Sequence, residues 1–112
     1  MVTSKATAEH YEWGAKCEGW RLLNRSDVSV IQECMPPGTQ ESRHYHAKAR
    51  QFFFILKGTA TMERDGESHS LGERQGIEIP PGIPHQIFNR STIDLEFLVI
   101  SSPTTIGDRV AT

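Results

Sequence analysis

The chain has 112 residues, of which 37% are hydrophobic, and a formal net charge of −2 at pH 7. This length suits one domain with one core, and the charge gives no electrostatic case for a nucleic-acid partner. The longest apolar run, FFFIL, is far shorter than the roughly 20 residues that span a bilayer, so we expect no membrane insertion. The N-terminal residues lack the apolar core of a secretory signal, which predicts a cytoplasmic protein whose cysteines, Cys17 and Cys34, are reduced.

Short segments typical of β-strands follow one another along most of the chain. In chain order they lie at 19–24, 27–34, 41–46, 51–58, 59–70, 76–85 and 93–101. The segment 59–70 is expected to be a hairpin with Asp65-Gly66 as its turn. No stretch shows a sustained helical period with caps, and glycines and prolines separate the segments. This pattern predicts an all-β barrel or sandwich.

The composition along the chain suggests three parts. We expect a flexible N-terminal segment at 1–10, a β-barrel domain at 11–103 and a C-terminal tail at 104–112. The strand that contains QFFFIL has apolar residues on both faces, whereas a lone antiparallel strand usually leaves one face wet. Either the N-terminal segment or a second subunit must cover the extra face, and we predict a homodimer.

Two histidines lie one residue apart in the stretch RHYH. Side chains alternate along a strand, so His44 and His46 point to one face and Tyr45 points to the other. Two neutral imidazoles on a rigid strand suit Zn, Ni, Fe, Cu or Mn. A metal site needs further ligands. Gln51 opens the next strand, and His85 follows a Pro-Gly corner that can aim it inward.

The spacing of these residues resembles the two signature motifs of the cupin superfamily. The first motif, Gly-x5-His-x-His-x4-(Glu)-x6-Gly, is matched by Gly38, His44, His46, Gln51 and Gly58. The second, Pro-x-Gly-x2-His-x3-Asn, is matched by Pro80, Gly82, His85 and Asn89. The resemblance, to the small single-domain bacterial type, covers about residues 28–101. It implies a jelly-roll β-barrel of two packed antiparallel sheets, with one divalent transition metal per chain at His44, His46, His85 and the Gln51 position.

Gln51 departs from the motif, because most members carry Glu there. Three imidazoles and an amide leave a divalent ion with its full charge of +2, which disfavours hard ions such as Mn and makes the ion a better Lewis acid. Gln51 either ligates through its amide oxygen or faces the ion across a water molecule. The chain is also similar, more weakly, to cupins of pectin and uronate breakdown that pair three histidines with a glutamine and open an unsaturated uronate into its linear keto form.

The resemblance implies a metal-dependent protein that acts on or binds a small, oxygen-rich, anionic molecule. We expect isomerisation, tautomerisation or ring opening of a sugar acid or keto acid, with Phe53, Ile55 and Ile87 lining the substrate pocket. A ferrous dioxygenase and a non-catalytic small-molecule binding protein are the alternatives. No catalytic base stands out. Gln32 and Cys34 line the barrel in one of the two possible phases of the strand 27–34.

Overall fold

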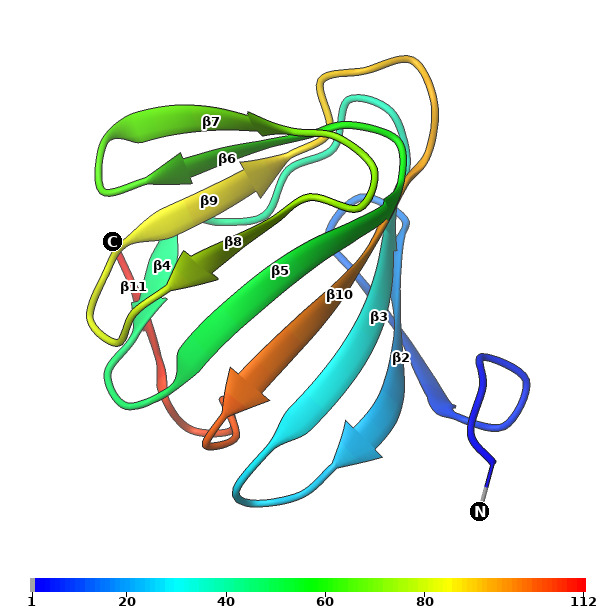
Figure 1. The fold of residues 1–112 in the computed structure, drawn as a ribbon, viewed down its shortest axis with the longest axis vertical. Helices are drawn as coiled ribbons and strands as arrows, with labels where there is room; N and C mark the ends of the chain where they lie inside the picture. Colours follow the sequence, from blue (N-terminus) through cyan, green and yellow to red (C-terminus); the bar gives the residue numbers. More distant parts are fainter. Residues whose placement is uncertain (1) are drawn as a thin grey trace.

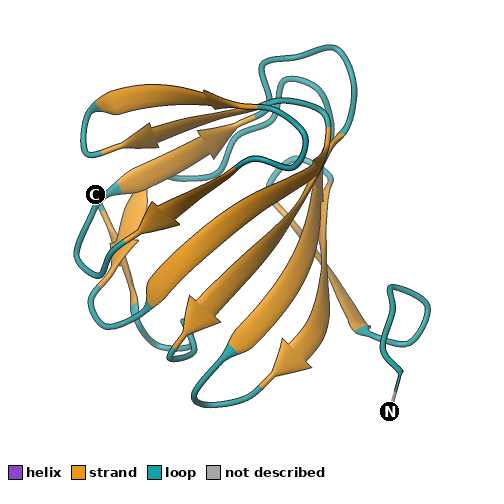
Figure 2. Ribbon diagram, viewed as in Figure 1, coloured by secondary structure: helices purple, strands orange, loops and turns teal. Residues whose placement is uncertain are grey.

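The structure, a computed structural model, describes residues 2–112 as β-strands joined by turns and loops, with no helix among them (Figures 1 and 2). Two antiparallel sheets pack against each other, so the predicted all-β jelly roll of two packed sheets is confirmed. The strands are β1 (Glu9–Trp13), β2 (Cys17–Asn24), β3 (Ser29–Met35), β4 (His44–His46), β5 (Arg50–Lys57), β6 (Ala60–Arg64), β7 (Glu67–Leu71), β8 (Gly76–Ile79), β9 (His85–Phe88), β10 (Leu95–Ser102) and β11 (Arg109–Ala111). Nowhere in the described part of the chain does a helix have the length and apolarity that crossing a membrane requires.

The larger sheet has the strand order β1-β2-β3-β10-β5-β8, and the smaller has the order β11-β4-β9-β6-β7. The core lies between the sheets because alternate residues of each strand point inward. In β10 the buried apolar side chains are Leu95, Phe97 and Val99, and Ser101 continues the same inward row toward the end of the strand. The inward row of β5 likewise changes from Ile55 and Phe53 to the polar Gln51. The core is therefore apolar at one end of the barrel and polar at the other.

The predicted hairpin at 59–70 is confirmed as β6 and β7. Arg64 pairs with Glu67, and the two turn residues, Asp65 and Gly66, have φ values of 53° and 91°. Two positive φ angles in a two-residue turn match the twist of the flanking strands, and Asp-Gly adopts them readily.

All three motif glycines, Gly38, Gly58 and Gly82, have backbone conformations that L-residues rarely adopt. Gly58 has a φ of 87°, and a Cβ atom there would lie 2.7 Å from the carbonyl oxygen of Asp94. Gly82 has a φ of 80°, and its N–H donates to the carbonyl of His46 at 2.7 Å. The Gly82 bond ties the loop before β9 to the end of β4, and so holds together the two chain segments that carry the histidines.

Asn89, buried at the end of the second motif, bonds to the backbone. Its amide nitrogen donates to the carbonyls of Met35 and Ile93, each at 2.8 Å, and its oxygen accepts from the N–H and hydroxyl of Ser91. These four hydrogen bonds give Asn89 a structural role. It joins the ends of β3 and β9 to the loop before β10.

Three strands lie where the sequence analysis placed no separate strand. β1 begins inside the segment expected to be flexible, β11 lies inside the expected tail, and β9 follows the Pro-Gly corner. β1 and β11 are short, and β11 is exposed along its length, so neither carries the apolar alternation that marks a strand in sequence. Pairing with β2 and with β4, rather than local propensity, makes them strands.

Candidate metal centre

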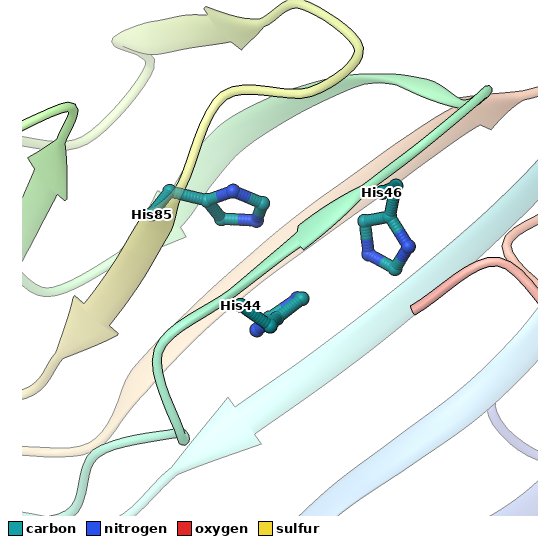
Figure 3. Close-up of side chains that lie close together, drawn as sticks. All are labelled: His44, His46 and His85. Atoms are coloured by element: carbon teal, nitrogen blue, oxygen red, sulfur yellow. The ribbon is translucent and has the colours of Figure 1, made fainter. Parts of the chain in front are cut away.

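Three buried histidines meet at one point in the smaller sheet. His44 and His46 lie on β4 and His85 lies on the neighbouring β9, where it pairs with His44 across the ladder. Figure 3 shows the three rings around one shared space. Each offers a ring nitrogen, and these nitrogens all lie within 4.8 Å of one another. The fold therefore brings together two motifs about 40 residues apart in sequence. The alternation of β4 predicted that His44 and His46 share a face, and the resemblance to the cupin motifs implied that His85 joins them.

Two of the imidazoles are oriented by their own backbone. The Nδ1 of His44 lies 2.8 Å from the carbonyl oxygen of Ser42, and the Nδ1 of His85 lies 3.0 Å from that of Ile83. A carbonyl only accepts, so each Nδ1 carries the proton and each Nε2 keeps its lone pair. The Nε2 of His85 and the Nδ1 of His46 are buried without a hydrogen-bond partner. In metal-binding histidines, a hydrogen bond from the nitrogen that does not bind the metal fixes the tautomer, as the Nδ1 bonds of His44 and His85 do here.

Burial keeps the three imidazoles neutral. Loss of solvation, with a smaller contribution from the neighbouring rings, lowers the pKa of His44 to about 4 and that of His46 to about 4. Loss of solvation also lowers the pKa of His85. Protonation of any one ring would place a cation beside the other two without water to screen it. Near pH 7 the site therefore presents three uncharged nitrogen donors, which is the form that binds a metal ion.

Gln51 lies at the start of β5 and is buried. Its amide nitrogen donates to the hydroxyl of Ser101 at 3.2 Å, across the pair that these residues form between β5 and β10. Its Oε1 is buried and has no hydrogen-bond partner. A buried amide oxygen left unpaired costs about 1–3 kcal/mol, so the position suits a ligand that the oxygen can meet.

The residues present fit a divalent transition metal. Three neutral imidazoles suit Zn, Cu, Ni and Fe, and the unpaired nitrogen of His85 and oxygen of Gln51 are donors that the protein itself leaves free. The three histidines can hold an ion, and their chemistry leaves its identity open among these metals.

His44 and His46 line a cavity of about 230 Å³, and His85 lies behind them in the cluster. His44, His46, Gln51 and Phe53 are among its lining residues, and the ring of Phe53 packs edge-on against His85 at 5.8 Å between centroids. Ile55 and Ile87, expected as pocket residues, do not line it. They lie deeper, in the apolar core cluster. Along the inward-facing side of β5, Phe53 still lines the cavity, whereas Ile55 belongs to the core.

Several polar side chains of the cavity were missed by the sequence analysis. Glu33, Glu41, Tyr11, Arg21 and Arg109 all line it. In β3 the phase is opposite to the one that would bring Gln32 and Cys34 inside, since Ile31, Glu33 and Met35 share the inner face. The alternation Ile31-x-Glu33-x-Met35 was the available signal. Tyr11 and Arg109 belong to strands that only tertiary pairing creates, so no local signal pointed to them.

Solved structures with the same fold have little sequence in common with this chain. KdgF from Halomonas sp. superposes with a TM-score of 0.85 at 14% identity, over 93% of this chain and 94% of its own. A predicted oxalate decarboxylase from Thermotoga maritima also reaches 0.85, at 20% identity, over 93% of this chain and 100% of its own. A sugar phosphate isomerase of the cupin superfamily from Silicibacter pomeroyi reaches 0.82 at 21% identity, over 93% of this chain and 76% of its own. At these identities the likeness shows the fold.

Sequence relatives are longer proteins. An uncharacterized protein of Methanocaldococcus jannaschii is 31% identical over 75 residues, which are 67% of this chain and 60% of that protein. A mannose-1-phosphate guanylyltransferase of Salmonella montevideo is 32% identical over 96 residues, which are 86% of this chain but 20% of that enzyme. The chain thus spans from about a fifth to three fifths of these relatives. Residues 31–101 match the cupin domain family, and they include all three histidines and Gln51. The chain belongs to the cupin family.

Proposed function

We propose that this cupin holds one divalent transition metal through His44, His46, His85 and Gln51, and that it acts on a small, oxygen-rich, anionic molecule. The observation that carries the proposal is the cluster of three buried histidines whose ring nitrogens lie within 4.8 Å of one another, among them Nε2 of His85, which has no partner. Gln51, whose Oε1 also has no partner, lines the same cavity as His44 and His46. A bound metal ion would accept the lone pairs of both the His85 nitrogen and the Gln51 oxygen. Water suits such a site less well, because every side-chain atom facing it is an acceptor.

Glutamine sets the charge of the site. No acidic residue belongs to the histidine cluster, so a bound divalent ion keeps its full charge. Such an ion, when bound, polarises a carbonyl or hydroxyl oxygen and stabilises negative charge that develops on it. Ser101 contributes by holding the amide nitrogen of Gln51, which leaves the amide oxygen directed away from that bond. Direct ligation by Gln51 is therefore part of the proposal.

The cavity favours a compact, polar ligand. Its volume of about 230 Å³ is below the range of roughly 300–1,000 Å³ that is usual for drug-sized ligands. Arg21 and Arg109 line it and can pair with a carboxylate or phosphate, while the Phe53 ring packs against His85. Sugar acids and keto acids have this size and chemistry. Isomerisation, tautomerisation or ring opening of such a molecule is the reaction we propose. Proteins similar to this chain include a sugar phosphate isomerase and a mannose-1-phosphate guanylyltransferase, whose names support an oxygen-rich ligand.

A homodimer is part of the same proposal. The outward side chains Phe52 and Leu56 of β5 are each 39% exposed, and Phe52 stacks on Phe54 at 6.3 Å between centroids. The N-terminal segment lies elsewhere, with Lys5 over the ring of Trp20 on β2. A second copy is the remaining cover for this apolar face. We expect light scattering to show that wild-type protein is a dimer and that Phe52→Asp is a monomer. A wild-type protein that is already monomeric would contradict the proposal.

Elemental analysis of protein purified without a histidine tag tests the metal, and thermal-shift screening with sugar acids and keto acids then tests the ligand. We expect about one transition metal per chain and stabilisation by at least one acid, followed by its conversion. Stabilisation without conversion would favour the binding protein. Oxygen uptake by iron-loaded protein with diketones, thiols or catechols would favour the dioxygenase. Protein that takes up no metal would contradict the proposal.

A further inference from the structure

Two glutamates form a second polar group in the cavity, apart from the histidines. Glu33 comes from β3, and Glu41 comes from the segment between β3 and β4. The Tyr11 hydroxyl donates to Oε2 of Glu33 at 3.1 Å. Oε1 of Glu41 is buried and has no hydrogen-bond partner. Gln51, a buried side chain whose Oε1 is also unpartnered, lines the same cavity. The cavity thus has unpaired acceptors both at the histidine cluster and at the glutamates.

The position of Glu33 is built across three strands. Tyr11 on β1 pairs with Gly19 on β2, and Gly19 pairs with Glu33 on β3. A Cβ atom at Gly19 would overlap the Tyr11 ring, so only glycine lets this ring lie across β2 and reach Glu33. Glycine in the interior of a strand costs stability relative to a residue with a side chain. The Tyr11–Gly19–Glu33 row therefore serves to hold the Glu33 carboxyl in place.

The charged and titratable groups around the pair come from four other parts of the fold. Tyr11 faces it from β1, Arg21 from β2, Arg109 from β11, and His44 and His46 line the same cavity from β4. Burial raises the pKa of Glu33 to about 7, against the opposing effects of Tyr11 and the two arginines. Burial and the charge of Glu33 raise the pKa of Glu41 to about 8. Near neutral pH one carboxyl is protonated while the other can be ionised.

We propose that Glu33 and Glu41 are the acid–base pair of this cavity and that Tyr11 is the residue that positions Glu33. The inference rests on the proposed function and specifies its substrates as keto acids or α-hydroxy carbonyl acids. Such a ligand has an acidic C–H bond next to a carbonyl, and one carboxylate with one carboxylic acid is the pair of groups that its enolisation needs.

The step is balanced without an oxidant or reductant. The ionised carboxylate accepts the proton of the C–H bond next to the carbonyl. The electron pair of that bond forms the carbon–carbon double bond of the enol, and the carbonyl π pair moves onto oxygen. The protonated carboxyl supplies the proton that this oxygen takes up. The pair holds one proton before and after the step, with the two carboxyls exchanged in role, and the reverse step at another carbon gives the isomer.

The first test follows the carboxyl carbons of Glu33 and Glu41 by ¹³C NMR in glutamate-labelled, metal-loaded protein, with Glu33→Gln and Glu41→Gln for assignment. We expect both to titrate well above the ordinary glutamate range near 4.3. Tyr11→Phe removes a bond that favours the charged form, so it should move the Glu33 titration to higher pH. Ordinary titration of both carboxyls, or no shift in Tyr11→Phe, overturns the proposal.

The second test measures deuterium exchange at the carbon next to the carbonyl of pyruvate, 2-oxobutyrate and 2-oxoglutarate, by proton NMR in D₂O. We expect wild-type protein to accelerate exchange with at least one probe, and Glu33→Gln and Glu41→Gln each to lower the rate by about 10²-fold or more. Glu33→Asp, which keeps the acid, should recover part of the rate, and Tyr11→Phe should shift its pH profile. Glu67→Gln, an exposed glutamate on β7, is the matched control.

Metal content separates the possible failures. Both glutamine variants should keep the metal content and the circular dichroism spectrum of wild type, because neither glutamate belongs to the histidine cluster. Wild-type protein without metal would overturn the proposed function. Metal-loaded wild type that exchanges none of the three probes, or glutamine variants that exchange as fast as wild type, would overturn this inference and leave the metal site standing.

Discussion

The cavity has two polar groups that are built in different ways, the histidine cluster (His44, His46 and His85) and the Tyr11–Glu33–Glu41 group. Two histidines are oriented by a carbonyl only two residues away in sequence, and the cluster belongs to adjacent strands of one sheet. Glu33 is held by a tyrosine two strands away, past a glycine that makes room for it. The orientation of His44 and His85 is thus set by their own chain segments, while the position of Glu33 depends on the pairing of β1 with β2 and of β2 with β3. Changes in one should leave the other largely intact.

The largest effect is expected from His85→Ala, which removes a ligand of the histidine cluster. Loss of a partner that only orients a ligand typically costs 10–100-fold in metal affinity, so loss of the ligand itself should cost more than about 100-fold. Competition with a chelator measures the change. His10→Ala is the matched control, because His10 is exposed and pairs with Glu18 on the outer surface. Equal affinities in wild type and His85→Ala would contradict the assignment.

Acid should destabilise the metal-free protein through the histidine cluster. The pKa of His44 falls from its ordinary 6.5 to about 4 on folding, so the unfolded chain binds a proton that the folded chain does not. Stability is therefore lost as the pH falls below 6.5, by roughly 2 kcal/mol for this residue at pH 5. Urea unfolding of metal-free wild type and His44→Gln at pH 7.5 and pH 5 isolates the effect.

Wild type must be compared with His44→Gln because Glu33 and Glu41 change the stability in the opposite direction as the pH falls. The raised pKa values of Glu33 and Glu41 make the folded state bind protons more readily than the unfolded state, so these residues add stability as the pH falls. Subtraction of the His44→Gln profile cancels that contribution. If the difference between the two proteins were the same at both pH values, the imidazole of His44 would not be held neutral by burial.

Gln51→Glu should change which metal ion the site prefers, while the site still binds a metal. A carboxylate lowers the net charge of the ion by one and is the oxygen donor that hard cations prefer, so affinity for Mn should rise by roughly tenfold or more relative to Zn. Metal titration with a fluorescent competitor measures both affinities. Ser101→Ala, which removes the partner of the Gln51 amide, is the companion variant and should weaken binding modestly. Unchanged selectivity in Gln51→Glu would show that Gln51 does not ligate.

Gly19→Ala should disturb the glutamate group alone. The added methyl group displaces the Tyr11 ring and breaks its bond to Glu33, at a cost of about 1–3 kcal/mol in stability. Metal affinity should stay within about twofold of wild type, because β4 and β9 lie in the other sheet. Thermal unfolding and chelator competition on the same sample test both parts. A large loss of metal affinity would contradict the separation of the two groups.

The smallest effect is expected at a turn outside both groups. Arg74 has a φ of 63°, in the left-handed region that glycine adopts freely. Its backbone N–H donates to the carbonyl of Ile55 at 2.8 Å, so the conformation is fixed by the fold. Relief of the left-handed conformation in Arg74→Gly should stabilise the protein by about 0.5–1 kcal/mol. The greater conformational entropy of glycine in the unfolded chain offsets part of this gain. Chemical denaturation measures it, and neither metal affinity nor probe exchange should change.

The same contrast explains which features could be predicted from the sequence. The inward row of β5 and the Asp65-Gly66 hairpin follow from strand alternation and turn chemistry, which are local. The convergence of His85 with His44 and His46 was expected from the resemblance to the cupin motifs. Glu33 was missed because the phase of its strand was left open. Tyr11 and Arg109 were missed because their strands exist only through pairing with β2 and β4. The boundary between cavity and core, which leaves Ile55 on the core side, depends on how the two sheets converge.

X-ray absorption spectroscopy of the metal-loaded, untagged protein tests the central claim most directly, because it reads the donor atoms around the ion. The account predicts three imidazole nitrogens at the distance typical of histidine ligation, about 2.0–2.1 Å for zinc, together with oxygen donors. It also predicts a spectrum with one imidazole fewer in His85→Ala. A spectrum with oxygen donors alone, or one that His85→Ala leaves unchanged, would contradict a metal held between β4 and β9.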